Sequence, residues 1–418
     1  MGRGFFLSAI LEDGGLFPFC STPMNAIAVS PVQHVGVIGG GQLAWMLAPA
    51  AQQLGMSLHV QTPNDHDPAV AIADQTVLAA VADAAATAKL AQACDVITFE
   101  NEFVDLPALT ELEETGVRFR PRPAAIASLL DKLDQRQLLT RLGLPTPRFL
   151  AIAAATATES ELTALGFPVV LKQRRHGYDG KGTQVLRSLA ELQQALQSYG
   201  DTPLLLEEFI PFEQELAVMV ARSQSGAIAT FPVVQTHQQN QVCRWVVAPA
   251  AIPGALQKAV AAIARTLVET VDYVGVAGIE LFQQGDRLWV NEIAPRTHNS
   301  GHYSLDACQT SQFEQQLRAI ADLPLGSTAL QWPGALMVNL LGFEDHQSGY
   351  AELRQQLAAL PGACLYWYGK TESKPGRKLG HITLPLSGAS STERAQQAQT
   401  MLAQVEAIWP NPDTAHQP

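Results

Sequence analysis

The chain has little charge, few cysteines and no long apolar run, and each absence excludes a class of protein. Charged residues make up only 16% of its 418 residues, and 27 basic against 39 acidic residues leave a net charge of −12. An acidic chain lacks the general basic surface that coats nucleic acid, so a bound anion would need a local basic cluster. The apolar runs are far shorter than the ~18 residues of a membrane-spanning helix. We therefore expect neither nucleic acid nor a membrane among its partners.

The cysteines form no metal or disulfide pattern. Five of them are scattered along the chain, and none belongs to a C-x-x-C pair. An odd, scattered set indicates neither a zinc site nor a disulfide framework. A reduced, cytoplasmic protein fits this usage.

The first 33 residues need a separate interpretation. The apolar segment FFLSAIL follows a single Arg3, as in a signal peptide, but Glu12 and Asp13 come directly after it. A signal peptide would also need a small-residue cleavage site, and none is convincing. We expect residues 1–33 to be a poorly ordered extension, with the functional start at Met24.

The remaining length suits two or three domains. Apolar strands at 34–38, 58–61, 76–80 and 96–100 alternate with helices at 42–54 and 82–93, which predicts a parallel α/β domain over residues 34–125. A helix at 131–142 opens a second domain, residues 126–328, with strands at 169–172, 183–186, 204–207, 216–221, 274–282 and 288–293. Residues 329–410 form a small third domain, with strands at 335–341 and 381–384. The expected fold class is a multidomain α/β and α+β protein.

A glycine turn follows the first strand. The sequence GGGQLA at residues 39–44 matches G-x-G-x-x-A between a strand and a helix, where backbone N–H groups can hold a phosphate. A dinucleotide fold also needs an acid at the end of the second strand. Gln61 and Thr62 stand there, and Asp65 lies in a turn. A nicotinamide-dependent oxidoreductase therefore lacks its second determinant, and a tight turn without nucleotide is the competing interpretation.

A basic, glycine-rich loop lies between two strands of the second domain. Lys172 ends one strand, residues 173–182 carry three glycines with Arg174, Arg175 and Lys181, and Thr183 opens the next strand. A P-loop would continue into a helix, so this is another kind of loop. It suits a mobile cover over a triphosphate. A solvated basic hairpin fits this segment equally well.

An acidic hinge follows a run of three leucines. Glu207, Glu208, Phe209 and Ile210 continue that apolar strand, and Glu215 lies just beyond. Backbone groups of such a hinge can read the edge of a base, while carboxylates accept from ribose hydroxyls. A solvated charged turn is the alternative.

The strongest local signal is a hairpin with two carboxylates. Counting outward from a turn at 283–287 places Glu280 nearly opposite Glu292 on otherwise apolar strands. Like charges across a ladder are destabilising, and buried carboxylates need a partner. Magnesium removes both objections because it binds carboxylate and phosphate oxygens together. Asn291 would supply a further ligand oxygen or a donor, so we favour a metal site over an exposed edge pair.

The loop after this hairpin has the composition of a substrate pocket. Arg296, Asn299, Ser300 and His302 lie close together in the segment 294–302. Polar side chains of this kind fix the orientation of a ligand. A lone histidine is more often structural, but His302 stands among other binding side chains.

A second basic cluster interrupts the third domain. Lys370, Lys374, Arg377 and Lys378 surround a Pro-Gly turn. Such a loop can hold a phosphate monoester. A solvated turn is an equal alternative on this segment alone.

Together these segments resemble the ATP-grasp superfamily and, within it, the 5-(carboxyamino)imidazole ribonucleotide synthase family of purine biosynthesis. The similar motifs are GGGQL at 39–43, GYDGKG at 177–182, NEIAPRTHNSGH at 291–302 and PGRKLGH at 375–381. The third is the most specific, because other ATP-grasp ligases share its Asn-Glu but not its NSGH. Biotin carboxylase is a weaker match at the third and fourth motifs.

The resemblance implies an ATP-grasp fold with an N-terminal pre-ATP-grasp domain and a small C-terminal domain. It implies a reaction in which ATP, bicarbonate and 5-aminoimidazole ribonucleotide give the N-carboxylated nucleotide, ADP and phosphate. Bicarbonate would attack the γ-phosphorus to form carboxyphosphate, which would deliver its carboxyl group through released CO2. Magnesium and a homodimer are implied as well.

The resemblance also assigns roles by position. The expected ATP contacts are Lys132, Lys172, Gly177, Tyr178, Asp179, Gly180, Lys181, Gly182, Glu207, Glu208, Phe209, Ile210, Glu215, Asn291 and Glu292. Magnesium would bind Glu280 and Glu292. The expected catalytic residues are Tyr178, Lys181, Arg296 and His302, and the expected substrate contacts are Gln42, Glu100, Asn299, Ser300, Lys370 and Arg377.

Two segments depart from the family pattern. The stretch 233–238 lacks the usual Glu-Asn and shifts a histidine, so no ATP contact is assigned to it, and residues 1–33 have no counterpart. The remaining alternatives are another ATP-grasp carboxylase or purine ligase and, in a different class, the nicotinamide-dependent oxidoreductase.

Overall fold

The computed structural model describes residues 32–153, 157–175, 177 and 182–411. The predicted extension at 1–33 falls almost wholly outside these residues. Tyr178, Asp179, Gly180 and Lys181 of the glycine-rich loop at 173–182 also lie outside them. In the described part, no helix is long and apolar enough to cross a membrane.

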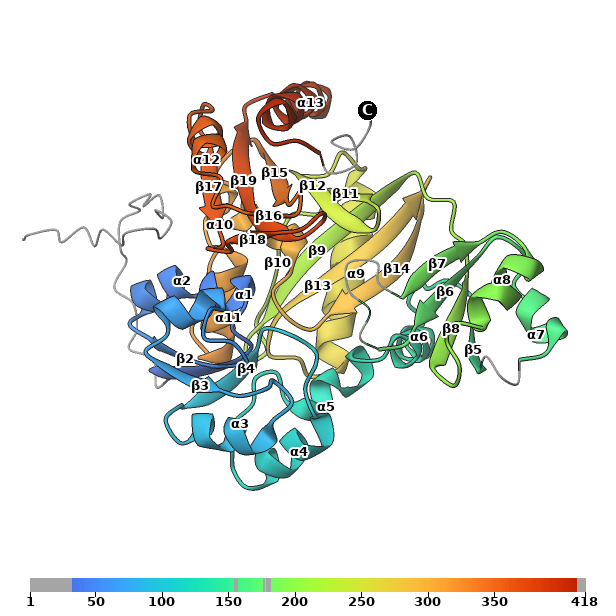
Figure 1. Cartoon of the computed structure of the whole chain (residues 1–418), viewed down its shortest axis with the longest axis horizontal. Helices are drawn as coiled ribbons and strands as arrows, with labels where there is room; N and C mark the ends of the chain where they lie inside the picture. Colours follow the sequence, from blue (N-terminus) through green and yellow to red (C-terminus); the bar gives the residue numbers. More distant parts are fainter. Residues whose placement is uncertain (1–31, 154–156, 176, 178–181, 412–418) are drawn as a thin grey trace, which may run out of the picture.

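The N-terminal region is a parallel four-stranded sheet in the order β3-β2-β1-β4, as the sequence predicts. Its strands are β1 (His34–Ile38), β2 (Ser57–Thr62), β3 (Gln75–Leu78) and β4 (Val96–Phe99). Its helices are α3 (Ala84–Ala91), α4 (Leu106–Glu114) and α5 (Pro123–Ile126), with short turns η1 (Pro68–Ile72) and η2 (Ala127–Leu129). Figure 1 shows these elements together at the start of the chain.

One predicted helix of this region is wrong in detail. The single helix expected at 42–54 is two helices, α1 (Gln42–Trp45) and α2 (Ala48–Leu54). Pro49 lies in the first turn of α2, where its missing N–H costs nothing, and it could not continue a helix that began at residue 42.

A separate antiparallel sheet has the order β5-β8-β6-β7 and lies beside the large sheet (Figure 1). Its strands are β5 (Phe149–Ala153), β6 (Val169–Gln173), β7 (Thr183–Leu186) and β8 (Pro203–Glu208). Helices α7 (Glu159–Thr163) and α8 (Leu189–Leu196) cover it, and α6 (Lys132–Arg141) precedes it in the chain. Strand β5 is an element that the sequence reading missed.

The large sheet has nine strands, with the path β14-β13-β9-β11-β12-β15-β19-β17 and β10 paired to β9. Its first strands are β9 (Gln214–Arg222), β10 (Ile228–Thr230), β11 (Val234–Gln239), β12 (Val242–Ala248), β13 (Gly275–Gln284) and β14 (Arg287–Ala294). Helix α9 (Gly254–Thr270) packs against β9 and β10 through one apolar face. This helix and strands β10 to β12 were also missed.

The C-terminal strands continue this same sheet. Strand β15 (Gly334–Leu341) pairs with β12, and β19 (Lys378–Leu386) and β17 (Cys364–Trp367) follow it. The remaining elements are α10 (Ser304–Ala307), α11 (Gln312–Ile320), α12 (Ala351–Ala358), α13 (Ser391–Ile408), the turn η3 (Asn299–Gly301) and the strand pair β16 (His346–Gln347) and β18 (Glu372–Ser373). The predicted α/β and α+β organisation is confirmed, while the boundary at 328–329 stays a prediction because the sheet is continuous across it.

Candidate active site

A single cavity of about 1480 Å³ lies between the two sheets and the N-terminal region. A pocket for one drug-sized ligand is typically about 300–1,000 Å³, so this cavity has room for two. It brings together most of the residues predicted from the sequence. Those that line it are Gln42, Glu100, Lys132, Lys172, Gly177, Glu207, Glu208, Phe209, Ile210, Glu215, Glu280, Asn291, Glu292, Arg296, Asn299, His302, Lys370 and Arg377.

Two predicted residues that the structure describes do not line this cavity. Gly182 precedes β7, and its φ of +78° suits glycine. Ser300 is 1% exposed and its hydroxyl lies 2.8 Å from Nδ1 of His298. Ser300 therefore lies behind His298 and orients that ring, so its placement does not support the expected contact with substrate.

The hairpin of β13 and β14 has the register expected from the sequence. Glu280 pairs directly with Glu292 across the two strands. The register then shifts, so that Leu281 faces Val290 and Asn291 is the extra residue of a β-bulge. A bulge re-aims a side chain next to a site, and here Nδ2 of Asn291 donates to Oε2 of Glu280 at 3.5 Å. The bulge thus gathers an amide and two carboxylates.

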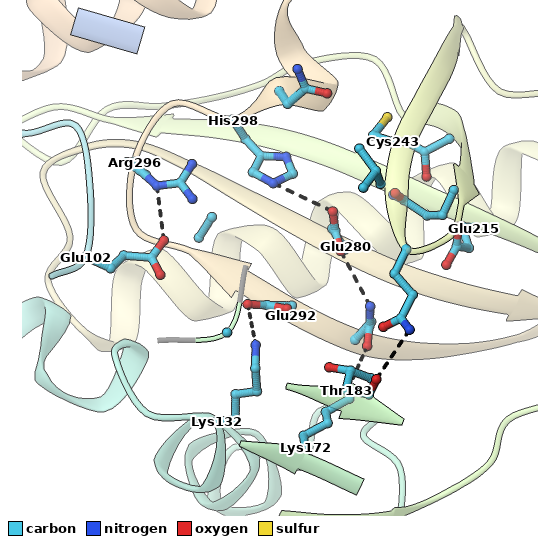
Figure 2. A pocket seen from close by; sticks show the side chains of 18 of the residues that line it. Glu102, Lys132, Lys172, Thr183, Glu215, Cys243, Glu280, Glu292, Arg296 and His298 are labelled. Atoms are coloured by element: carbon cyan, nitrogen blue, oxygen red, sulfur yellow. Dashed lines mark hydrogen bonds and ion pairs between the residues drawn. The ribbon is translucent and has the colours of Figure 1, made fainter. Parts of the chain in front are cut away.

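Glu215, Glu280 and Glu292, hereafter the acidic cluster, come from the neighbouring strands β9, β13 and β14 and line the same cavity (Figure 2). Burial and the neighbouring charge of Glu292 raise the pKa of Glu280 to about 7. Burial and the charge of Glu280 likewise raise the pKa of Glu215 to about 7. Burial is the larger cause of both shifts and repulsion between the carboxylates is the second, and a cation bound among them would oppose both.

The third carboxylate of the cluster has a cation of its own. Nζ of Lys132 lies 2.5 Å from Oε1 of Glu292. Burial alone would raise the pKa of Glu292, but Lys132 outweighs burial and leaves that pKa below its usual value. Lys132 begins helix α6, directly after the N-cap residue Asp131, so the helix start carries this lysine to the hairpin.

A buried ion network lies beneath the acidic cluster. Glu207 is 2% exposed, with Oε1 at 2.6 Å from Nε of Arg136 and Oε2 at 2.9 Å from Nζ of Lys172. Burial would raise the pKa of Glu207, but the two cations bring it to about 2. Lys172 also donates to Oδ1 of Asn291 at 3.1 Å. Both carboxylate oxygens of Glu207 are therefore engaged in holding cations.

Arg136 was missed by the sequence reading. It lies one helical turn after Lys132 on α6, and its guanidinium also donates to the carbonyl oxygens of Val290 and Asn291, at 3.1 and 2.6 Å. The i, i+4 spacing of Lys132 and Arg136 was the available signal. The network ties α6, the small sheet and the hairpin together.

His298 was also missed. It lines the cavity, and its Nε2 lies 3.6 Å from Oε1 of Glu280 (Figure 2). His302, which was chosen instead, touches the cavity wall but is 0% exposed. Burial and the nearby His381 lower the pKa of His302 well below its usual value. Asn299 shares two hydrogen bonds with Asn339, at 2.9 and 2.7 Å, which anchor the loop to β15.

The segment of Lys370, Lys374, Arg377 and Lys378, hereafter the basic loop, lines the same cavity. Lys370 donates to Oε1 of Gln42 at 3.2 Å and to the carbonyl of Lys378 at 3.0 Å. Burial, followed by the charge of Arg377, lowers the pKa of Lys370 to about 8.

Glu372, which the sequence analysis did not select, lies beside the cavity without lining it. It pairs at 2.7 Å with both Lys374 and Arg377. Glu372 lies between Lys370 and Lys374 in the sequence, so its contact with the basic loop could have been predicted. These pairs orient the two cations beside the cavity.

The glycine turn at 39–41 holds a carboxylate of the same chain. The N–H groups of Gly41 and Leu43 donate to the two oxygens of Glu100, at 3.1 and 3.3 Å. A Cβ on Gly41 would lie 2.3 Å from Oε1 of Glu100, so this approach requires glycine. The N–H groups that would hold a dinucleotide phosphate are thus engaged, which disfavours the oxidoreductase.

The stretch 233–238 contributes to the cavity although no role was assigned to it. Gln235, Thr236, His237 and Gln238 line the wall formed by β11. The ring of His237 stacks on Trp245 with centroids 5.0 Å apart. This wall is a part of the site that the motif comparison could not find.

The chain matches three family models along most of its length. Residues 32–129 match the ribonucleotide synthetase preATP-grasp domain, residues 137–313 the ATP-grasp domain, and residues 335–397 the phosphoribosylaminoimidazole carboxylase C-terminal domain. These matches confirm the predicted ATP-grasp fold with its flanking domains.

Similar sequences and similar crystal structures indicate the same family. N5-carboxyaminoimidazole ribonucleotide synthase of Synechocystis is 50% identical over 384 residues, which are 90% of this chain and 97% of that protein. A crystal structure of an N5-carboxyaminoimidazole ribonucleotide synthetase with ADP has a TM-score of 0.83 at 34% identity, covering 94% of this chain and 100% of that one. The Aspergillus clavatus enzyme, in complex with ADP and 5-aminoimidazole ribonucleotide, has a TM-score of 0.81 at 32% identity, covering 90% and 99%. The resemblance drawn from the motifs is confirmed, and the chain belongs to the N5-carboxyaminoimidazole ribonucleotide synthase family of ATP-grasp ligases.

Proposed function

We propose that this chain performs its family's reaction with the acidic cluster as the nucleotide and metal site and the basic loop as the second phosphate site. The reaction is the ATP-dependent carboxylation of 5-aminoimidazole ribonucleotide to N5-carboxyaminoimidazole ribonucleotide in purine biosynthesis. The finer assignments are bicarbonate as the carboxyl donor and the roles of individual residues.

One observation carries the residue assignment. Glu280 and Glu292 lie directly opposite each other, with Asn291 bulged between them, in the same cavity as the basic loop. The hairpin offers hard oxygen ligands with a deficit of positive charge, and the loop offers cations. Two phosphate compounds can therefore bind in one cavity in two ways, one through a metal and one through direct ion pairs.

Magnesium fits the donor set at the hairpin. The described residues include no group of three or more histidine, cysteine or acidic side chains that would hold a metal alone. Magnesium commonly combines one or two carboxylates with substrate phosphate oxygens, so Glu280, Glu292 and the amide oxygen of Asn291 would suffice as protein ligands. The bound ion would neutralise and orient the phosphate oxygens of ATP.

The nucleotide would lie between the small sheet and the hairpin. Lys132 and Lys172 supply positive charge for its phosphates, and Glu207 holds Lys172 in place at 2.9 Å. The backbone of Glu208, Phe209 and Ile210 would contact adenine, with Glu215 toward the ribose. The residues Gly177, Tyr178, Asp179, Gly180, Lys181 and Gly182 would cover the triphosphate.

Bicarbonate and the amine would meet near the loop after the hairpin. They would be surrounded by Arg296, which pairs with Glu102 at 3.1 Å, and by Tyr178 and Lys181 of the glycine-rich loop. His302 would lie at the wall. Bicarbonate would attack the γ-phosphorus and displace ADP, giving carboxyphosphate. Carboxyphosphate would break into CO2 and phosphate, and the amine would add to CO2 and lose a proton. The chain contributes chiefly by positioning and by neutralising charge.

The ribonucleotide phosphate would bind the basic loop. Lys370 and Arg377 supply the charges, while Gln42, Glu100 and Asn299 would line the rest of the substrate wall, and Ser300 would act only through its bond to His298. We further propose a cytoplasmic homodimer, as the cysteine usage and the family resemblance suggest.

The test is the substrate dependence of ADP release in the presence of magnesium. ADP should form only when ATP, bicarbonate and 5-aminoimidazole ribonucleotide are all present. Carboxylation supported equally well by another amine would favour a different ATP-grasp ligase. Binding of NADH, with no effect of ATP, would contradict the ligase altogether.

A further inference from the structure

Three buried glutamines on α11 each bridge a neighbouring segment. They are Gln312, Gln315 and Gln316, all at most 3% exposed. Gln315 accepts from the N–H of Gly326 at 3.0 Å and donates to its carbonyl at 2.6 Å. Gln316 accepts from the N–H of Val276 at 2.6 Å and donates to the hydroxyl of Thr98 at 2.8 Å. Helix α11 therefore uses three side-chain amides to hold neighbouring segments in place behind the cavity.

Gln312 applies the same clamp to a residue of the site. Its Oε1 accepts from the backbone N–H of His298 at 3.0 Å, and its Nε2 donates to the backbone carbonyl of His298 at 2.7 Å. Gly301 allows this approach, because a Cβ there would lie 2.6 Å from Oε1 of Gln312. Both backbone groups of His298 thus bond to one side chain that does not itself line the cavity, and the N–H of Gly301 also donates to the His298 carbonyl at 3.0 Å.

The same amide also determines where His302 carries its proton. The two bonds to His298 distinguish the oxygen of Gln312 from its nitrogen, since one end accepts and the other donates. The second N–H of that nitrogen lies 3.3 Å from Nδ1 of His302. Nδ1 must then accept, so the proton of the neutral imidazole is on Nε2.

We propose that Gln312 is a positioning residue for the carboxylation reaction. It holds the backbone of His298, so that this ring stays in the cavity beside Glu280, and it fixes His302 as the Nε2–H tautomer. The proposal rests on the proposed function insofar as both histidines line the cavity in which bicarbonate and the amine would meet.

Fixing the tautomer has a chemical consequence. A neutral His302 with its proton on Nε2 is a buried donor, not a base, directly behind the cavity wall. Nε2 has no hydrogen-bond partner among the residues that the structure describes. A buried donor of this kind is costly to leave unpaired, and the Nδ1–H tautomer would instead place two donors against each other at Gln312.

The tautomer is tested directly by ¹⁵N NMR of histidine-labelled protein. In the wild-type chain, Nδ1 of His302 should have the resonance of an unprotonated ring nitrogen and Nε2 that of a protonated one. The signal is assigned by its loss in His302→Asn. A proton found on Nδ1 would overturn the proposal without any Gln312 variant.

The variant Gln312→Glu preserves the size of the side chain but not its donors. A carboxylate accepts from Nδ1–H, so the proton should move to Nδ1 or both nitrogens should become protonated. It also cannot donate to the carbonyl of His298. We expect kcat to fall about 10- to 100-fold, as for other outer positioning partners, and KM for ATP to stay within about twofold.

Gln315→Glu is the matched control. It makes the same chemical change on the same helix, in a residue that is also 0% exposed and that clamps a backbone in the same way. It should lose a similar amount of stability, yet keep the His302 spectrum and kcat. An equal fall in kcat for both variants, or an unchanged His302 spectrum in Gln312→Glu, would overturn the proposal. Absence of carboxylation in the wild-type chain would instead overturn the proposed function, and the spectra would still decide the role of Gln312.

Discussion

The acidic cluster and the basic loop share one cavity but are built in opposite ways. In the acidic cluster, burial and mutual repulsion raise the pKa of Glu280 and of Glu215 to about 7, and only Glu292 has a lysine close by. In the basic loop, Lys374 and Arg377 both pair with Glu372, and burial lowers the pKa of Lys370 to about 8. Negative charge is in excess in the acidic cluster, and positive charge is in excess in the basic loop.

This difference indicates how each part binds phosphate. Under the proposed function, a metal cation would lie between the carboxylate cluster and the phosphates of ATP, because the carboxylates alone would repel them. A basic loop attracts a phosphate directly, with charge-assisted hydrogen bonds. The two substrates can therefore be distinguished by their dependence on metal, and each part can be disabled separately.

The largest expected effect comes from removing a charge of the acidic cluster. Glu292→Gln should lower the rate of ADP release about 10³-fold, because it removes a metal ligand and leaves Lys132 without its partner. Circular dichroism should show that the fold survives. Glu269→Gln, a surface carboxylate on α9, is the control and should retain full activity. Unchanged turnover in Glu292→Gln would refute the metal assignment.

The next effect is on stability and concerns the ion network beneath the acidic cluster. Glu207→Gln should lower the free energy of unfolding by about 3 kcal/mol, because Arg136 and Lys172 stay buried without their counter-charge. Urea denaturation measures this loss. Glu208→Gln is the matched control, since its pair with Arg148 lies at the surface and should contribute at most about 1 kcal/mol. Equal losses in the two variants would show that burial does not distinguish these pairs.

A smaller effect is expected from the basic loop. Arg377→Ala should raise KM for the ribonucleotide about tenfold, because it removes one charge-assisted contact to the phosphate. KM for ATP should not change, which makes it the internal control in the same steady-state measurement. A normal KM for the ribonucleotide would remove Arg377 from the phosphate site.

The smallest effect is a pH dependence of the same constant. Because the pKa of Lys370 is lowered to about 8, its cation is present below that pH and lost above it. KM for the ribonucleotide should therefore rise about fourfold between pH 7 and pH 8.5. Lys370→Arg should abolish this rise, because a guanidinium keeps its proton. A rise that persists in the variant would assign the titration to another group.

The sequence was most informative where function depends on neighbours along the chain. The opposition of Glu280 and Glu292 follows from counting outward from one turn, and the register confirms it. The break between α1 and α2 was equally readable from Pro49. Helix α9 also had a visible apolar face, at Leu256, Val260 and Ile263, and was overlooked.

Contacts between residues that are far apart in the sequence could not be predicted from it. Arg136 bonds to Glu207, which is 71 residues away, and Gln312 bonds to the backbone of His298 from helix α11, with α10 between them in the chain. The i, i+4 spacing places Arg136 on the same face of α6 as Lys132, but nothing in the local pattern of α6 or α11 shows which distant residue each side chain meets. The sequence prediction named His302 and left out His298, although both line the cavity, because exposure to the cavity is decided by packing and not by spacing.

The unbroken pairing of β12 with β15 has a mechanical consequence. The hairpin and the basic loop are carried by strands of one sheet, so they cannot hinge apart without breaking a ladder of backbone hydrogen bonds. The four-stranded sheet of β5 to β8 has no such ladder to the rest of the described chain. Any opening that admits the nucleotide should therefore move this smaller sheet. The distance between the two proposed phosphate sites should stay constant, because one continuous sheet carries both.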